Sequence, residues 1–197
     1  MKEEVVINRE PLANLDISEI PPERIILLKG TIDWPRVDAI VEKLHELSAK
    51  PTPVLIEFNS RGGEFWDGLH LYDRFRLSAV PVVGRVMGVA HSAALTALQG
   101  CHLRIASANA RFVLHEPYME LRTRLKRRTG TSVLEFVATQ IDAVSENSLR
   151  VLNILLERVG ATADEVMRRK VENLFFGEER ILTPEEILEF RFLDRIV

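Results

Sequence analysis

A serine among small residues stands where the chain could perform nucleophilic chemistry. Ser92 lies within residues 88–94, Gly-Val-Ala-His-Ser-Ala-Ala, where a second backbone can pass close to it. His115 ends the strand-like run 111–115, and an imidazole that titrates near about 6.5 can take a hydroxyl proton at neutral pH. The turn Ser60-Arg61-Gly62-Gly63 could present backbone N–H groups to an oxyanion. These are the parts of a serine hydrolase.

Each of these residues also has a purely structural interpretation. Ser92 could be a small residue that packs a helix against a sheet, and His115 could be a hydrogen-bonded histidine at a strand end. Two adjacent glycines are common in turns. His91 precedes the serine, but on the helix expected over residues 90–99 its side chain would point elsewhere. The order of the three motifs along the chain favours the catalytic interpretation.

Strands that alternate with helices must position these residues. Continuous apolar runs predict buried strands, and apolar residues at helical spacing predict helices between them. This alternation predicts an α/β fold of βαβ units with parallel strands and right-handed crossovers. The expected strands cover residues 24–29, 54–58, 81–87, 103–106 and 111–114. The expected helices cover residues 35–47, 66–75, 90–99, 132–158 and 163–170, with a last one that starts at Thr183-Pro184-Glu185-Glu186.

Length and composition bound the class of protein. The 197 residues fit one domain, and 46% hydrophobic with 28% charged residues is a globular balance. With a net charge of −3, the protein has no overall positive potential that would attract nucleic acid. The basic run at 122–128 is expected to be a solvated face or a subunit contact. We expect no membrane span and no signal peptide, hence a cytoplasmic protein. Cys101, the single cysteine, excludes an intramolecular disulfide and is expected to be buried. No histidine pair has metal-ligand spacing, so we expect no metal and no cofactor.

The ordered motifs resemble those of the ClpP peptidases, within the wider ClpP/crotonase fold. The matching order is strand, Ser-x-Gly-Gly, helix, strand, Gly-x-Ala-x-Ser, buried helix, His-x-Pro, long helix, Thr-Pro-Glu-Glu and Leu-Asp. The resemblance covers residues 24–117 and 178–197, the expected core of one domain over 1–197. Residues 118–177 match mainly as a long projecting helix, which is expected to make oligomer contacts.

The resemblance implies a serine endopeptidase that hydrolyses peptides or unfolded proteins inside a homo-oligomeric ring. Ser92 matches the family's nucleophile and His115 its general base. Gly63 and Ala93 match the positions whose N–H groups form the oxyanion hole. The count back from Thr183 gives Glu179 as the acid, where the family has aspartate. Glu172, Asn173 and Glu178 remain alternatives for that role.

Three departures from the family pattern bear on substrate and partner. Arg61 replaces the proline that usually follows the turn serine, and Tyr118 begins a segment that replaces a glycine-rich strand. The N-terminal segment lacks the family's axial stretch, which argues against docking to an ATP-dependent unfoldase. Two other functions therefore stay open, a non-catalytic or regulatory ClpP-like subunit and a crotonase-type acyl-CoA enzyme.

Overall fold

The computed structural model describes residues 12, 14–118, 130–160 and 165–197. Its strands are β1 (Ile25–Lys29), β2 (Val54–Ser60), β3 (Val82–His91), β4 (Leu103–Ala106), β5 (Arg111–Val113), β6 (Ile181–Leu182) and β7 (Arg195–Ile196). Its helices are α2 (Trp34–Leu47), α3 (Phe65–Arg76), α4 (Ala93–Gln99), α5 (Gly130–Val159), α6 (Glu165–Phe175) and α7 (Pro184–Glu189), preceded by the 3₁₀ turns η1 (Ile17–Glu19) and η2 (Pro22–Arg24).

The strands form one sheet whose central member is β3. The main path runs β1-β2-β3-β4-β7 with parallel pairing throughout, as the βαβ pattern predicts. β3 has ten residues and is long enough to pair with two strands along the same edge. Its residues 83–86 pair with β4, and its residues 89–91 pair with β5. β6 pairs with β5 in the antiparallel direction, which the sequence pattern did not predict.

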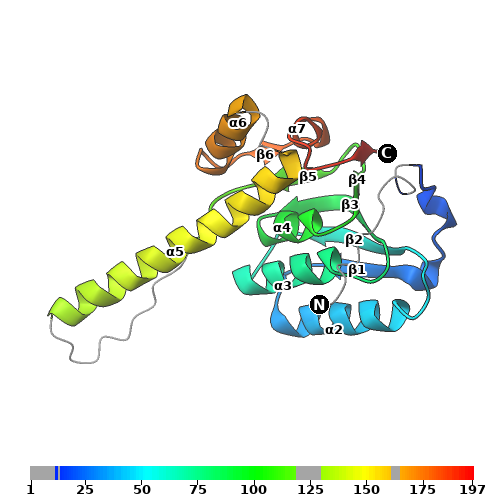
Figure 1. The fold of residues 1–197 in the computed structure, drawn as a ribbon, viewed down its shortest axis with the longest axis horizontal. Helices are drawn as coiled ribbons and strands as arrows, with labels where there is room; N and C mark the ends of the chain where they lie inside the picture. Colours follow the sequence, from blue (N-terminus) through cyan, green and yellow to red (C-terminus); the bar gives the residue numbers. More distant parts are fainter. Residues whose placement is uncertain (1–11, 13, 119–129, 161–164) are drawn as a thin grey trace, which may run out of the picture.

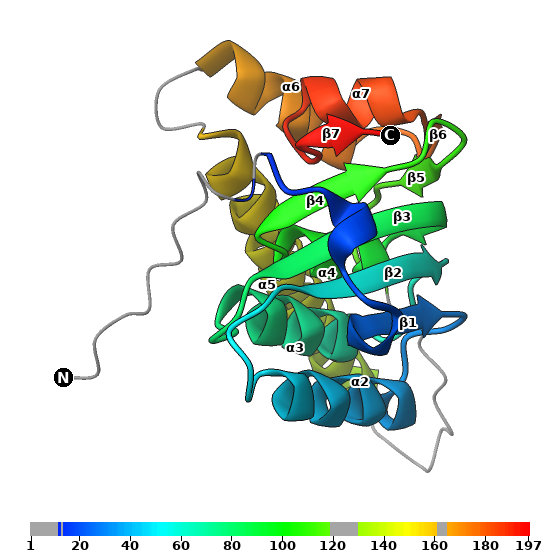
Figure 2. The ribbon, with the colours of Figure 1, turned by 90° about the vertical axis from the view of Figure 1, so that its right-hand side faces the viewer.

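Helices α2, α3 and α4 cover one face of the sheet, and the segment before β1 crosses the opposite face (Figures 1 and 2). The helix side holds the large core, in which all seven residues of α4 are buried. Leu12 and Ile20 pack on the other side against residues of β2, β3 and β4. Cys101 is fully buried, as expected, and burial raises the pKa of its thiol.

The long helix α5 projects from the body at one end (Figure 1). Its last turns are buried in the core through Val151, Leu152, Leu155 and Val159, whereas its outer half exposes apolar side chains. The C-terminal tail returns to the sheet, where Asp194 binds the buried Arg104 at 2.6 and 2.9 Å. Within the described ranges, no helix combines the length and the apolar character that crossing a bilayer requires.

The expected elements are confirmed except at some of their ends. The helix expected over residues 90–99 is wrong at its start, because β3 continues through His91 and α4 begins at Ala93. The pairing of β3 with β5 extends the strand by several residues, and no local pattern of small residues shows such a pairing. The basic run at 122–128 and the first residues of the helix expected at 163–170 lie outside the described residues.

Candidate active site

Ser92 occupies the junction between β3 and α4. Its backbone angles are φ 51° and ψ −124°, which a residue with a Cβ rarely adopts. Such backbone strain persists only where the surroundings hold it, and it is common at active sites. The Ser92 N–H donates to the Val113 carbonyl at 2.8 Å, so β5 holds the junction in place. The turn leaves Ser92 half-buried on the wall of a cavity.

The glycine turn after β2 lies directly against this junction. A Cβ on Gly62 would lie 2.8 Å from the His91 carbonyl oxygen and 3.0 Å from the Ser92 Cβ. Ser60 secures the turn, since its hydroxyl donates to the Gly30 carbonyl at 2.6 Å and accepts from the Gly62 N–H at 3.1 Å. Only glycine allows the two backbones to approach this closely.

Two backbone N–H groups beside the serine are available to a ligand. Gly62 and Glu64 donate within the protein, to Ser60 and to Ile32, but Gly63 between them makes no hydrogen bond through its N–H to any described residue. Ala93 is the first residue of α4, where a helical N–H has no intrahelical acceptor. Both residues line the cavity together with Ser92. The pair has the character required of an oxyanion hole.

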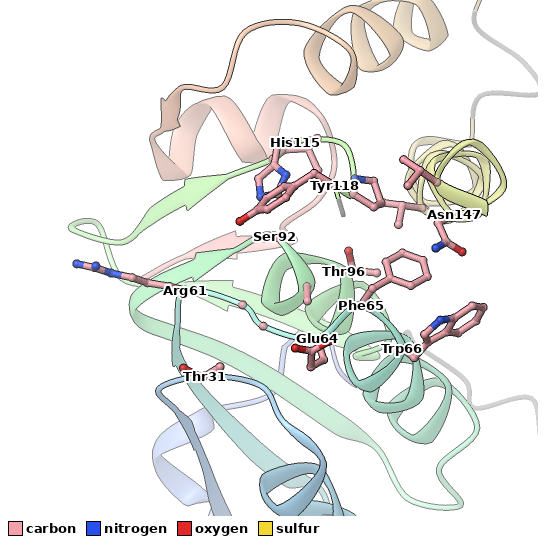
Figure 3. Close-up of a pocket in the computed structure, with 17 residues that line it drawn as sticks. Thr31, Arg61, Glu64, Phe65, Trp66, Ser92, Thr96, His115, Tyr118 and Asn147 are labelled. Carbon is pink, nitrogen blue, oxygen red and sulfur yellow. The ribbon is translucent and has the colours of Figure 1, made fainter. Parts of the chain in front are cut away.

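His115 lies on the same cavity wall, two residues after β5 (Figure 3). Its Nδ1 lies 2.6 Å from the Glu116 carbonyl oxygen. A carbonyl only accepts, so Nδ1 carries the hydrogen and Nε2 keeps the lone pair that a general base needs. No hydrogen bond joins the Ser92 hydroxyl to His115 in the described part of the chain. The structure thus brings nucleophile and base to one cavity, with no hydrogen bond between these two described residues.

Glu179 lies two residues before β6, in the segment that leads into the strand. β5 and β6 pair Val113 with Ile181, and this antiparallel register, if continued by two residues beyond the strand ends, would set Glu179 opposite His115. Glu179 is exposed, and its carboxylate makes no hydrogen bond to His115 among the described residues. Of the alternatives, Glu172 and Asn173 lie on α6, where Glu172 pairs with Arg168 at 3.0 Å, and Glu178 is exposed.

The cavity has a volume of about 740 Å³ and extends from Ser92 toward α5 (Figure 3). Its walls are of mixed character, with polar side chains from Thr31, Arg61, Glu64, Thr96 and Asn147 beside apolar and aromatic ones. This space is large enough for a peptide side chain beside the nucleophile. The apolar part of the wall is formed by the side chains of Phe65, Trp66, Leu114, Pro117, Tyr118, Val144 and Val151.

Sequence reasoning missed two contributors to this site. It assigned the long helix to oligomer contacts, although Val144, Asn147 and Val151 of α5 line the cavity. Their helical spacing could have indicated a shared face, but not what that face contacts. It also gave His91 a helical position, whereas the structure sets it at the end of β3 beside the nucleophile. Burial is the main cause that lowers the pKa of His91, and the Arg61 charge lowers this pKa further.

A strained serine between a strand and a helix, two free N–H groups and a nearby histidine define a hydrolase that uses a serine nucleophile. The Clp protease family model matches residues 9–197. The chain belongs to the Clp protease family, whose members are serine peptidases.

Curated relatives and a solved structure agree with this assignment. The chain is 28% identical to ATP-dependent Clp protease proteolytic subunit 2 of Tropheryma whipplei, over 88% of this chain and 91% of the relative. It is 29% identical to the proteolytic subunit 2 of Streptomyces coelicolor, over 89% and 76%. A mutant ClpP1 from Listeria monocytogenes superimposes with a TM-score of 0.70 over 89% of this chain and 91% of that one, at 18% identity. The fold is therefore that of ClpP, as predicted.

Proposed function

We propose that this chain is a ClpP-type endopeptidase subunit in which Ser92 attacks the peptide carbonyl and His115 takes its proton. The observation that carries the proposal is the strained position of Ser92, in a cavity that Gly63 and Ala93 also line. The negative charge of the tetrahedral intermediate would lie between the N–H groups of these two residues. One such donor lowers a barrier by about 3–4 kcal/mol.

Glu179 is the proposed third member. Its register position opposite His115 supports an acceptor role toward Nδ1–H. In that role the carboxylate replaces the Glu116 carbonyl, fixes the tautomer and stabilises the imidazolium. His115 would also have to turn toward the Ser92 hydroxyl, and both residues border the same cavity.

We infer that the working form is a homo-oligomeric ring that acts on peptides or unfolded protein segments. The relatives are named as proteolytic subunits of an ATP-dependent protease, and the projecting α5 supports an association through its exposed apolar side. The single domain and the cytoplasmic location stay predictions, and docking to an ATP-dependent unfoldase stays possible but doubtful on the N-terminal sequence.

The direct test is labelling with a fluorophosphonate together with cleavage of short fluorogenic peptides. We expect one adduct, located on Ser92 by peptide mass spectrometry, and loss of both labelling and cleavage in Ser92→Ala. The matched control is Ser18→Ala, since Ser18 is exposed and does not line the cavity. Ser18→Ala should cleave and label like the wild type. Cleavage that persists in Ser92→Ala would refute the assignment.

A regulatory, non-catalytic subunit is the second candidate. The observation in its favour is that His115 Nδ1 contacts the Glu116 carbonyl, while no hydrogen bond to Ser92 is found among the described residues. Absence of label and of cleavage across substrates and pH, in a protein whose assembly is intact by light scattering, would establish this candidate instead. Tight acyl-CoA binding in calorimetry would favour a crotonase-type enzyme.

A further inference from the structure

The strand pairings connect His91 with the segment that holds the proposed catalytic acid. His91 ends β3 and pairs with Val113 of β5, which in turn pairs with Ile181 of β6. Side chains at paired positions point to the same face of a sheet. Glu179 precedes Ile181 by two residues, just before β6, so an extended backbone between them would return its side chain to this face. His91 and Glu179 would then flank β5 from opposite sides.

The imidazole of His91 is surrounded by charges from three segments. Its Nε2 is buried and has no hydrogen-bond partner among the described residues. The groups that act on it are Arg61 from the turn after β2, Glu179 from the segment before β6 and His115 from the segment after β5. Burial, Arg61 and His115 disfavour a proton on His91, whereas the Glu179 carboxylate favours one.

The acid and the base each have another partner in this arrangement. The Nδ1 of His115 contacts the Glu116 carbonyl and not a carboxylate. Burial and Arg61 lower the pKa of His91, and the Glu179 charge is the smaller influence that opposes them. One carboxylate thus lies within electrostatic reach of a histidine other than the proposed base.

Building on the proposed function, we propose that His91 is a positioning residue that competes with His115 for Glu179. A protonated His91 holds the carboxylate on its own side of β5. A neutral His91 releases it to accept from the His115 Nδ1–H, and the catalytic set then assembles. Burial and the Arg61 charge lower the pKa of His91, which favours the neutral form that releases Glu179.

The consequence is an acid limb of activity that depends on two protons. As the pH falls, one proton blocks the base His115 and a second converts His91 into a cation that draws Glu179 away. With both titrations active, each further pH unit lowers the wild-type kcat/KM about 100-fold, whereas one titration lowers it about tenfold. Removal of His91 should therefore halve the slope of the acid limb.

The experiment measures kcat/KM for a fluorogenic peptide between about pH 5 and 9, with each profile normalised to its own plateau. We expect His91→Ala and His91→Gln to show the single-proton limb, while His45→Gln, at an exposed position on α2, keeps the two-proton limb. In Glu179→Gln, the further change His91→Ala should leave the slope unaltered. Equal slopes in the wild type and both His91 variants would overturn the proposal.

A second readout does not depend on activity. The His91 resonance of protein labelled with carbon-13 in its histidine rings reports the pKa of that imidazole by NMR. Glu179→Gln should lower this pKa, because the carboxylate that favours the proton is gone. An unchanged His91 titration would refute the competition even in an active enzyme. An inactive wild type with this shift present would instead refute the proposed function alone.

Discussion

At the residue scale, the close contact of two backbones makes the nucleophile possible. Ser92 has a positive φ, and the N–H of Ala93 follows it directly, so any displacement of this junction moves both the hydroxyl and one proposed oxyanion donor. Gly62 packs against this junction from the other side, and its φ of 92° is in the left-handed region. The geometry of the site therefore depends on Gly62 having no side chain.

We predict that Gly62→Ala destabilises the protein by about 2–4 kcal/mol, the sum of overpacking and left-handed backbone strain. The new Cβ would meet the His91 carbonyl, the Ser92 Cβ and the Ala93 nitrogen. Peptide cleavage should fall at least about tenfold, because the donor and the nucleophile shift together. Denaturant unfolding and initial rates measure the two effects.

Gly160→Ala is the matched control. Gly160 also has a positive φ, of 67°, but a Cβ there would meet nothing within 4 Å. The left-handed backbone conformation alone predicts that Gly160→Ala lowers the free energy of unfolding by about 1–2 kcal/mol and leaves peptide cleavage unchanged. Equal stability losses in the two variants would show that packing at Ser92 plays no part.

At the element scale, caps and pairings decide where each functional residue lies. α7 begins with a capping box, in which Thr183 accepts from the Glu186 N–H at 3.3 Å and Glu186 accepts from the Thr183 N–H at 2.8 Å. Arg180 donates to the same carboxylate, and this hydrogen bond is the largest cause that lowers the pKa of Glu186. The cap directly follows β6, the strand that sets the register of Glu179.

We expect Thr183→Ala to cost about 1 kcal/mol of unfolding free energy, because an N-terminal N–H of α7 loses its acceptor. Thr183→Ser keeps the hydroxyl and should retain most of the stability. Both proteins should lose stability as the pH falls through the lowered pKa of Glu186, because Arg180 and the Thr183 N–H favour its ionised form in each, and the deficit should persist because the lost bond does not involve the carboxylate. Urea unfolding at neutral and acidic pH measures both effects, and a deficit equally large in Thr183→Ser would contradict a capping role.

At the scale of the whole molecule, α5 joins the site to the outer surface. Its middle and last turns line the cavity through Val144, Asn147 and Val151. The side chains of Leu134, 72% exposed, and Ile141, 60% exposed, lie seven residues apart on one face of the projecting part. An exposed apolar stripe of this kind is typical of a surface that another chain covers.

We predict that Ile141→Asp weakens self-association, because the new carboxylate would lose its water in an apolar contact without gaining a hydrogen-bond or ion-pair partner. Thr139→Asp adds the same charge on the opposite side of α5 and should assemble normally. Light scattering coupled to size-exclusion chromatography distinguishes the two. Identical masses at all concentrations would argue against contacts through this face of α5.

The sequence by itself determined the parts of this protein that depend on short stretches of chain. Alternating apolar runs and helical spacing indicated the strands and helices, and the small residues around Ser92, the glycine turn and the Thr183 cap each carry a local signal. These features are local because they arise from the steric and hydrogen-bonding preferences of neighbouring residues.

Only the tertiary structure decided which distant residues share the site. Pairing of β3 with β5 carried the strand through His91, and pairing of β5 with β6 brought the segment that holds Glu179 beside β5 from far along the chain. Packing of the end of α5 against the core turned Val144 and Asn147 toward the cavity. Strand register and helix packing depend on the free energy of the whole fold. Each strand could pair with several others of similar local preference, and the observed pairing is the one that gives the lowest total free energy. No single segment of the sequence determines that total.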